Sequence, residues 1–122
     1  MSEAVEQRCV EVALQSGRFD TLAAAGLKGQ HFTDRTLAAF FDACLEVHHA
    51  GQGIDKLEIV LRLKSDGRLT ESQAERILQL NDLPGETTGL FIADYAAEII
   101  SGWRQSHAEQ LAHRAEFYRK DG

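Results

Sequence analysis

The sequence predicts an all-α protein: a compact orthogonal bundle of about six helices, the last of which is long. Three observations support this fold class. Apolar residues recur at helical spacing in one segment after another, and cap residues and glycines separate these segments. No stretch alternates apolar and polar residues as a half-buried strand does. A length of 122 residues suits one domain, so we expect a single helical domain over residues 1–122.

Two helices are expected before residue 26. The first has Ser2 as its N-cap and continues to about Ser16, with an inward stripe of Val5, Cys9, Val12 and Ala13. The second covers Phe19 to Ala25. Glycines and polar residues then fill positions 26–31, which indicates a loop.

The third helix has the clearest apolar pattern. Thr33 is its expected N-cap, because a threonine hydroxyl accepts from free amides of a first turn. The buried face is expected to comprise Leu37, Phe40, Phe41, Cys44, Leu45 and His48. Gly51 is expected to end the helix in the left-handed conformation.

The fourth helix is expected between Asp55 and Gly67. Asp55 and Glu58 have the spacing of a capping box at its start. The predicted inward stripe consists of Leu57, Val60, Leu61 and Lys64, widened by Ile59 and Leu63.

The last two helices follow from two further signals. Thr70 and Gln73 form a second capping-box pair, which opens a helix over Glu71 to Leu80. After a turn containing Pro84, a long helix is expected from about Thr88, with Gly102 as a candidate bend. Its stripe steps by four residues through Phe91, Tyr95, Ile99 and Trp103.

Charge and composition exclude several function classes. The net charge is -6, and no basic cluster with interleaved aromatics occurs, so a DNA-binding helical domain is disfavoured. The acidic N-terminal segment does not resemble a signal peptide, and no long apolar run occurs, so we expect a cytoplasmic protein. Cys9 and Cys44 fall on apolar faces without metal-ligand spacing, which indicates buried, reduced thiols and no metal site.

The residues from 41 to 69 resemble the N-terminal domain of DnaB-type replicative helicases. The matching stretches are Phe41 to His48, then Gly51, Ile54-Asp55, Ile59, Leu63, Gly67 and Leu69. They follow the family patterns F-E-A-(apolar)-L-E-L, G-x-P-I-D and T-V-x-x-x-L-x-x-x-G-x-L, with Gly53 in place of the proline. Flanking stretches near Glu6-Gln7 and Tyr95-Ala96 agree, so the resemblance covers roughly residues 4 to 105.

This resemblance implies a non-catalytic role in DNA replication. Such domains form a collar, associate with one another, and receive primase or a helicase loader. The family's head would cover about residues 2–102, and the first helix of its pairing hairpin would begin over about 103–119. An alternative is a stand-alone phage- or plasmid-type protein that uses the same fold to bind a host replication protein.

No enzymatic constellation is evident in the sequence. It contains no Gly-Lys dipeptide and therefore no Walker A loop, so we expect neither ATP hydrolysis nor a bound cofactor. An orphan enzyme using Asp94, Glu98 and His107 in one cleft is the alternative from another class.

The candidate interaction surface is the segment from residue 103 to residue 118. Of the segments 1–30, 31–50, 51–100 and 101–122, the last alone has more basic than acidic residues, with 4 basic and 3 acidic. Its apolar residues share a face but are too sparse for a fully buried helix, which indicates contact with a second copy or another protein. The expected contact residues are Trp103, His107, Leu111 and Tyr118, and the alternative face carries Asp42, Glu46 and His49.

Overall fold

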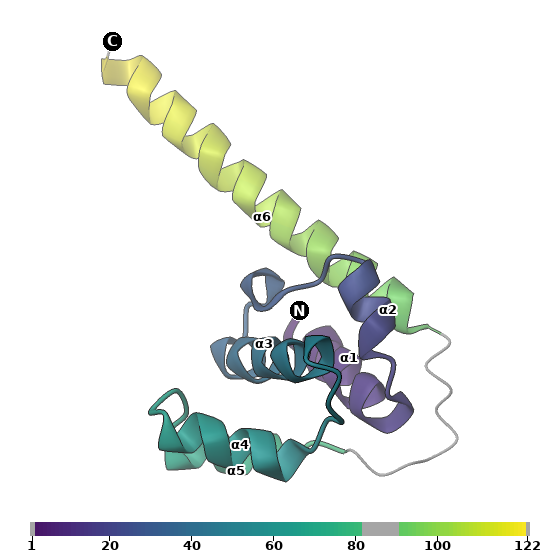
Figure 1. The fold of residues 1–122 in the computed structure, drawn as a ribbon. Helices are drawn as coiled ribbons and strands as arrows, with labels where there is room; N and C mark the ends of the chain where they lie inside the picture. The colour runs from purple at the N-terminus through teal and green to yellow at the C-terminus, as the bar shows by residue number, and fades with distance from the viewer. Residues whose placement is uncertain (1, 82–90, 122) are drawn as a thin grey trace.

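The computed structural model describes the backbone of residues 2–81 and 91–121, and side chains over 4–81 and 91–109. All regular structure in these residues is helical, and no strand occurs among them. This confirms the predicted all-α class. The elements are α1 (Ser2–Ser16), α2 (Phe19–Ala24), the 3-10 turn η1 (Gly29–His31), α3 (Arg35–His49), α4 (Lys56–Ser65), α5 (Glu71–Leu78) and α6 (Ile92–Asp121) (Figure 1).

Helix α3 lies at the centre of the core and packs against α1, α2, η1, α4 and α5. The ring of Phe41 lies 5.1 Å from that of Phe32 and 6.3 Å from that of Phe19, measured between centroids. The predicted face is confirmed at all of its apolar positions, and His48 is half-buried where the helix ends. The buried residues of α3 are Thr36, Leu37, Ala38, Phe40, Phe41, Ala43, Cys44, Leu45 and Val47.

Helices α1 and α6 pack against each other, although they lie at opposite ends of the chain. The inward side of α6 consists of Ile92, Ala96 and Ile99, with Tyr95 and Trp103 partly buried. Phe91 is exposed, so the expected face was wrong at this residue, which precedes the first helical residue. Beyond the head, α6 continues as one helix through Gly102 and projects away from the other helices (Figure 1).

The start of α3 differs from the prediction. Asp34 is the N-cap, and its carboxylate accepts hydrogen bonds from the amides of Thr36 and Leu37. Thr33 is not the cap, because its amide and hydroxyl both donate to Glu6 of α1. Similarly, Ser2 is the first residue of α1 rather than the residue before it.

The predicted inward face of α4 is confirmed at Ile59, Val60 and Leu63 and is wrong at Leu57, Leu61 and Lys64. Leu57 and Leu61 are exposed, whereas Ile59, Val60 and Leu63 are buried. Among the described elements, helix α4 packs mainly against α3 and α5. Its apolar residues surround more of the helix than these two neighbours cover. The stripe expected through Leu57, Leu61 and Lys64 therefore faces solvent.

The helix ends follow the turn chemistry of the sequence. Gly51 and Gly67 have φ of 76° and 75°, and these left-handed residues end α3 and α4 as expected. The capping box of Thr70 and Gln73 is confirmed at the start of α5. Helix α5 ends at Leu78 rather than Leu80, and the start expected near Thr88 for the long helix lies outside the described residues. None of the described helices has the length and apolarity that a membrane crossing requires.

Candidate interaction site at the root of α6

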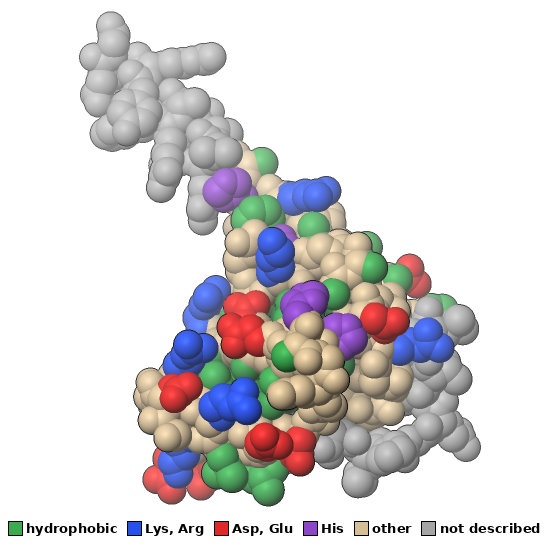
Figure 2. All heavy atoms as spheres, viewed as in Figure 1, with side chains coloured by type: hydrophobic (Ala, Val, Ile, Leu, Met, Phe, Trp, Pro, Cys, Tyr) green, Lys and Arg blue, Asp and Glu red, His purple; other side chains and the backbone are tan. Residues whose placement is uncertain are grey.

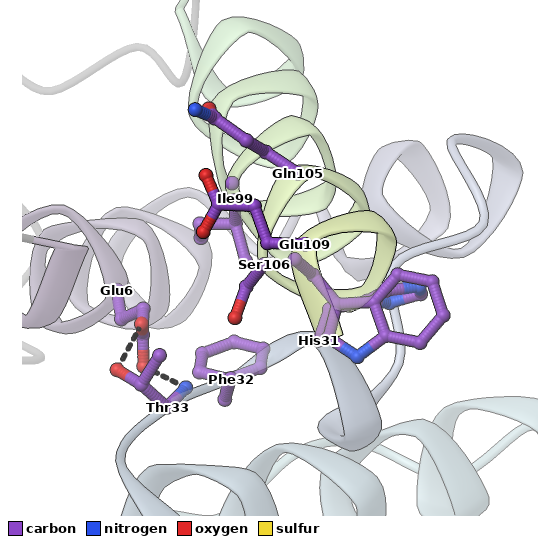
Figure 3. Close-up of a pocket in the computed structure, with 10 residues that line it drawn as sticks. Glu6, His31, Phe32, Thr33, Ile99, Gln105, Ser106 and Glu109 are labelled. Carbon is purple, nitrogen blue, oxygen red and sulfur yellow. Dashed lines mark hydrogen bonds between the residues drawn. The ribbon is translucent and has the colours of Figure 1, made fainter. Parts of the chain in front are cut away.

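A pocket lies where α6 leaves the head, between this helix, α1 and the segment that follows η1. Its volume is about 410 Å³. Phe32, Ile99 and Trp103 contribute apolar surface, and polar side chains of α6 stand along one side (Figure 3). A hollow of this kind can accept an apolar side chain with a polar neighbour. The lining consists of Glu6, His31, Phe32, Thr33, Ile99, Gly102, Trp103, Gln105, Ser106 and Glu109.

One wall of the pocket depends on the buried carboxylate of Glu6. Its Oε1 accepts the amides of Thr33 and Asp34 at 2.9 and 3.0 Å, and its Oε2 accepts the Thr33 hydroxyl at 2.7 Å (Figure 3). Three hydrogen bonds offset the desolvation of a carboxylate that is fully buried. Glu6 therefore joins α1 to the chain entering α3 and fixes the backbone beside Phe32.

A second wall is formed by His31 and Trp103. The imidazole of His31 and the indole of Trp103 meet in a T-shaped arrangement, with ring centroids 4.8 Å apart and planes at 87°. The Lys28 amide donates to Nδ1 of His31 at 3.0 Å, so the neutral ring carries its proton on Nε2. Burial lowers the pKa of His31 below 6.5, and the positive charges of Arg104 and Lys28 act in the same direction.

The turn that carries His31 is held against α3 by Gly29. The Gly29 amide donates to Oδ1 of Asp42 at 2.7 Å. A Cβ atom at this position would lie 2.8 Å from the carbonyl oxygen of Ala38 and would overlap the Asp42 carboxylate. Only glycine allows η1 to approach α3 this closely, and this approach sets the position of His31.

The predicted interaction residues lie partly in this site. Trp103 is half-buried, lines the pocket and stacks on His107, with ring centroids 5.1 Å apart and planes at 6°. His107 itself is exposed and lies outside the pocket lining, because the helix turns by about 100° per residue and directs Gln105 and Glu109 to the other side. The side chains of Leu111 and Tyr118 lie outside the described residues.

Sequence reasoning missed Glu6 and His31 as parts of this site. Glu6 has a detectable signal, since it shares the helical spacing of Val10 and Ala13 and is therefore an acidic residue on a buried face. His31 has no such signal, because it lies in a polar loop. Its contact with Trp103 spans most of the chain.

The alternative catalytic set does not assemble. Asp94, Glu98 and His107 are all exposed on α6, and 13 residues of helix separate the first from the last by about 20 Å. Among the described residues, no group of three His, Cys, Asp or Glu side chains could hold a metal ion. Cys9 and Cys44 are buried and free, and burial raises the pKa of the Cys9 thiol to about 12 and that of Cys44 further.

The family model of the DnaB-like helicase N-terminal domain matches residues 4–101. The chain belongs to this family. The match covers the helical head of this DnaB-like domain and ends two residues before Trp103, so most of the projecting part of α6 lies beyond it. The matched region is the non-catalytic, N-terminal part of such helicases. No curated protein and no solved structure matches the chain.

Proposed function

We propose that this DnaB-like domain acts in DNA replication as a non-catalytic, cytoplasmic interaction domain that associates with itself through α6. The observation that carries this proposal is the form of α6. Its first turns are anchored in the head by Ile92, Ala96 and Ile99, and the helix then continues to Asp121 away from the other helices (Figure 1). In this proposal the head comprises about residues 2–102 and the pairing arm about 103–119.

The residues of the arm favour pairing with a second copy. Trp103, His107, Leu111 and Tyr118 fall within about 80° of one another around the helix axis, which gives a narrow apolar strip. At the base of this strip, the stacked rings of Trp103 and His107 provide a flat surface that is still partly open to solvent. Aromatic side chains at the centre of a contact contribute much of its free energy.

The test of this function is a substitution in the middle of the strip. Leu111→Asp should shift the sedimentation mass toward the monomer while the far-ultraviolet circular dichroism of the domain stays unchanged. Gln105→Asp is the matched control, because it places the same charge on α6 more than 90° away from Leu111. An unchanged mass in both Leu111→Asp and Tyr118→Asp would contradict the pairing of α6.

A second protein is proposed at the pocket beside Trp103. Domains of this family take part in protein–protein contacts, and the resemblance points to primase or a helicase loader. Trp103 is the single tryptophan of the chain, so its fluorescence reports on occupation of the pocket. Titration with a primase or helicase loader from the same source should change the fluorescence emission of Trp103, and Phe32→Ala should weaken this change. A stand-alone protein that binds a host replication protein would give the same response with that host protein instead.

A further inference from the structure

The turn η1 is closed by the side chain of its own last residue. The amide of Lys28 donates to Nδ1 of His31 at 3.0 Å, and the amide of His31 donates to the carbonyl oxygen of Lys28, also at 3.0 Å. Two hydrogen bonds of opposite direction therefore join the same two residues. A backbone amide can only donate, so the bond to Nδ1 exists only while this nitrogen is unprotonated. The neutral imidazole of His31 is thus a structural part of the turn.

The same turn connects α3 with the root of α6. At one end, the amide of Gly29 donates to Asp42 of α3, and at the other end the ring of His31 meets the indole of Trp103. The turn packs against both helices. It ends directly before Phe32, so it carries one lining residue of the pocket and leads into the next. Any opening of η1 would therefore move Phe32 and His31 relative to α6.

The place that His31 occupies disfavours a charged imidazole. Only 8% of the residue is exposed, and burial is the largest influence that lowers its pKa below 6.5. The positive charges of Arg104 on α6 and Lys28 beside the turn act in the same direction. The carboxylate of Asp42 on α3 acts in the opposite direction, and it is the weakest of these influences.

The other titratable groups around this pocket do not reverse that preference. Glu6 of α1 is occupied by three hydrogen bonds from the chain entering α3, and Glu109 of α6 is exposed to water, which screens its charge. His107 stacks on Trp103 and adds a second positive charge there whenever it is protonated. An imidazolium at His31 would gain from contact with the indole. It would lose both its water and its bond from the backbone, so the neutral ring is favoured in the closed turn.

We propose that His31 is an acid-sensitive latch for the pocket beside Trp103. While the ring is neutral, η1 is closed and holds Phe32 and Trp103 in the arrangement that forms the pocket. When Nδ1 takes a proton from water, the Lys28 amide loses its acceptor, the turn opens and the imidazolium moves away from Trp103 into solvent. This inference rests on the proposed binding of a second protein at the pocket, and it adds a condition under which that protein is released.

The first experiment needs no partner, because Trp103 is the only tryptophan of the chain. It uses the full chain with Leu111→Asp, which removes arm pairing, and with His107→Gln, which removes the imidazole stacked on the indole. Between about pH 7.5 and pH 5, the fluorescence emission of Trp103 should shift to longer wavelength and its quenching by acrylamide should increase. The midpoint should lie below pH 6.5, and the far-ultraviolet circular dichroism should stay unchanged through this transition.

Two further variants assign the transition to one histidine. Histidine side chains lie on the visible surface both at the root of the projecting helix and over the end of α3 (Figure 2). His31→Gln should abolish the transition, because its amide oxygen still accepts from the Lys28 amide but takes no proton. His48→Gln with His49→Gln is the matched control and should keep it. Hydrogen exchange of the Lys28 amide, corrected for its intrinsic pH dependence, should become about tenfold faster when His31 is protonated.

The second experiment adds a primase or helicase loader from the same source. Its affinity should fall about tenfold between about pH 7.5 and pH 5.5, and the fall should disappear in His31→Gln. The latch is refuted if Trp103 shows no transition, if the transition persists in His31→Gln, if the helical signal is lost with the same midpoint, or if His31→Gln loses affinity as steeply as the original chain. Absence of binding at pH 7.5 in a chain that shows the transition refutes the proposed binding of these proteins instead.

Discussion

The carboxylate of Glu6 accepts both the amide and the hydroxyl of Thr33, at 2.9 and 2.7 Å, across 27 residues of chain. This contact uses a threonine that would otherwise cap α3, and Asp34 takes over the cap. It also fixes one wall of the pocket, since Glu6 belongs to α1 and Thr33 follows Phe32. The position of the pocket therefore depends on one buried carboxyl group.

We expect Glu6→Ala to lower the free energy of unfolding by about 3 kcal/mol, because it leaves the amides of Thr33 and Asp34 without their acceptor in a buried place. Glu6→Gln should cost only about 1 kcal/mol, since its amide oxygen still accepts and the Thr33 hydroxyl can reverse its role. Urea denaturation followed by circular dichroism measures both values. Gln7→Ala, an exposed neighbour on α1, is the control and should change little. Equal losses in the alanine and glutamine variants would show that shape rather than hydrogen bonding matters.

Gly29→Ala should destabilise the domain by about 1–3 kcal/mol, because the added methyl group would meet the Ala38 carbonyl and the Asp42 carboxylate. Gly53→Ala is the matched control, since a Cβ atom there meets nothing within 4 Å. Thermal unfolding of the two variants gives the comparison. The fluorescence emission of Trp103 should also change in Gly29→Ala but not in Gly53→Ala. A displaced η1 would move His31, whose ring contacts Trp103. If Gly29→Ala and Gly53→Ala have the same melting temperature, η1 can accommodate a methyl group beside α3 without loss of stability.

Acidification should destabilise the domain through His31. Its pKa is lowered in the folded protein, so the unfolded chain binds a proton first as the pH falls through about 6.5. Neutral His31 therefore contributes fully to the stability of the domain above pH 6.5, and this contribution is lost progressively below pH 6.5. His31→Gln keeps an acceptor for the Lys28 amide and should flatten the dependence between about pH 6.5 and pH 5. Urea denaturation midpoints measured across this pH range test the prediction. If the midpoint depends on pH as steeply in His31→Gln as in the original chain, a group other than His31 causes the loss of stability.

Asp34 acts in a lower pH window and can be separated from His31. Burial alone would raise its pKa, but the hydrogen bonds from Arg76, Leu37 and Thr36 outweigh burial and hold the pKa below 3.8. Its contribution to stability is thus present above about pH 4 and is lost as the pH falls through the lowered value. The slope between pH 5 and pH 6.5 therefore belongs to His31 rather than to this carboxyl group.

The sequence was sufficient for the helices and for most of the core, for a physical reason. Periodicity and cap chemistry are local, and α3 shows this well: Phe40, Phe41 and Cys44 are buried as its spacing predicts, and Gly51 ends it. The error at α4 has a different origin. Its apolar residues surround more of the helix than its neighbours cover, so spacing alone could not decide between Leu57 and Ile59 as the inward residue.

The candidate site was predictable only in part. Trp103 was identified because a large aromatic residue on a sparse helix is a local signal. The partners that form the pocket with it, Glu6 and His31, come from α1 and η1, and only the packing of α6 on these elements brings them together. The cap of α3 was misassigned for the same reason, since the long-range contact of Thr33 with Glu6 decides it.

Gly102 lies inside α6, between the turns that are anchored in the head and the projecting arm. A Cβ atom at this residue meets nothing within 4 Å, and the residue has no positive φ. Gly102→Ala should therefore stabilise the domain by about 0.5–1 kcal/mol, because alanine loses less backbone freedom on entering the helix. Gly26→Ala is the control for available space. The surroundings of Gly26 are equally open, but its φ of 82° is unfavourable for alanine, so this variant should lose stability. Thermal melting of the two variants should move in opposite directions. A lower melting temperature for Gly102→Ala would mean that α6 needs a bend at this residue when its arm is in contact with another molecule.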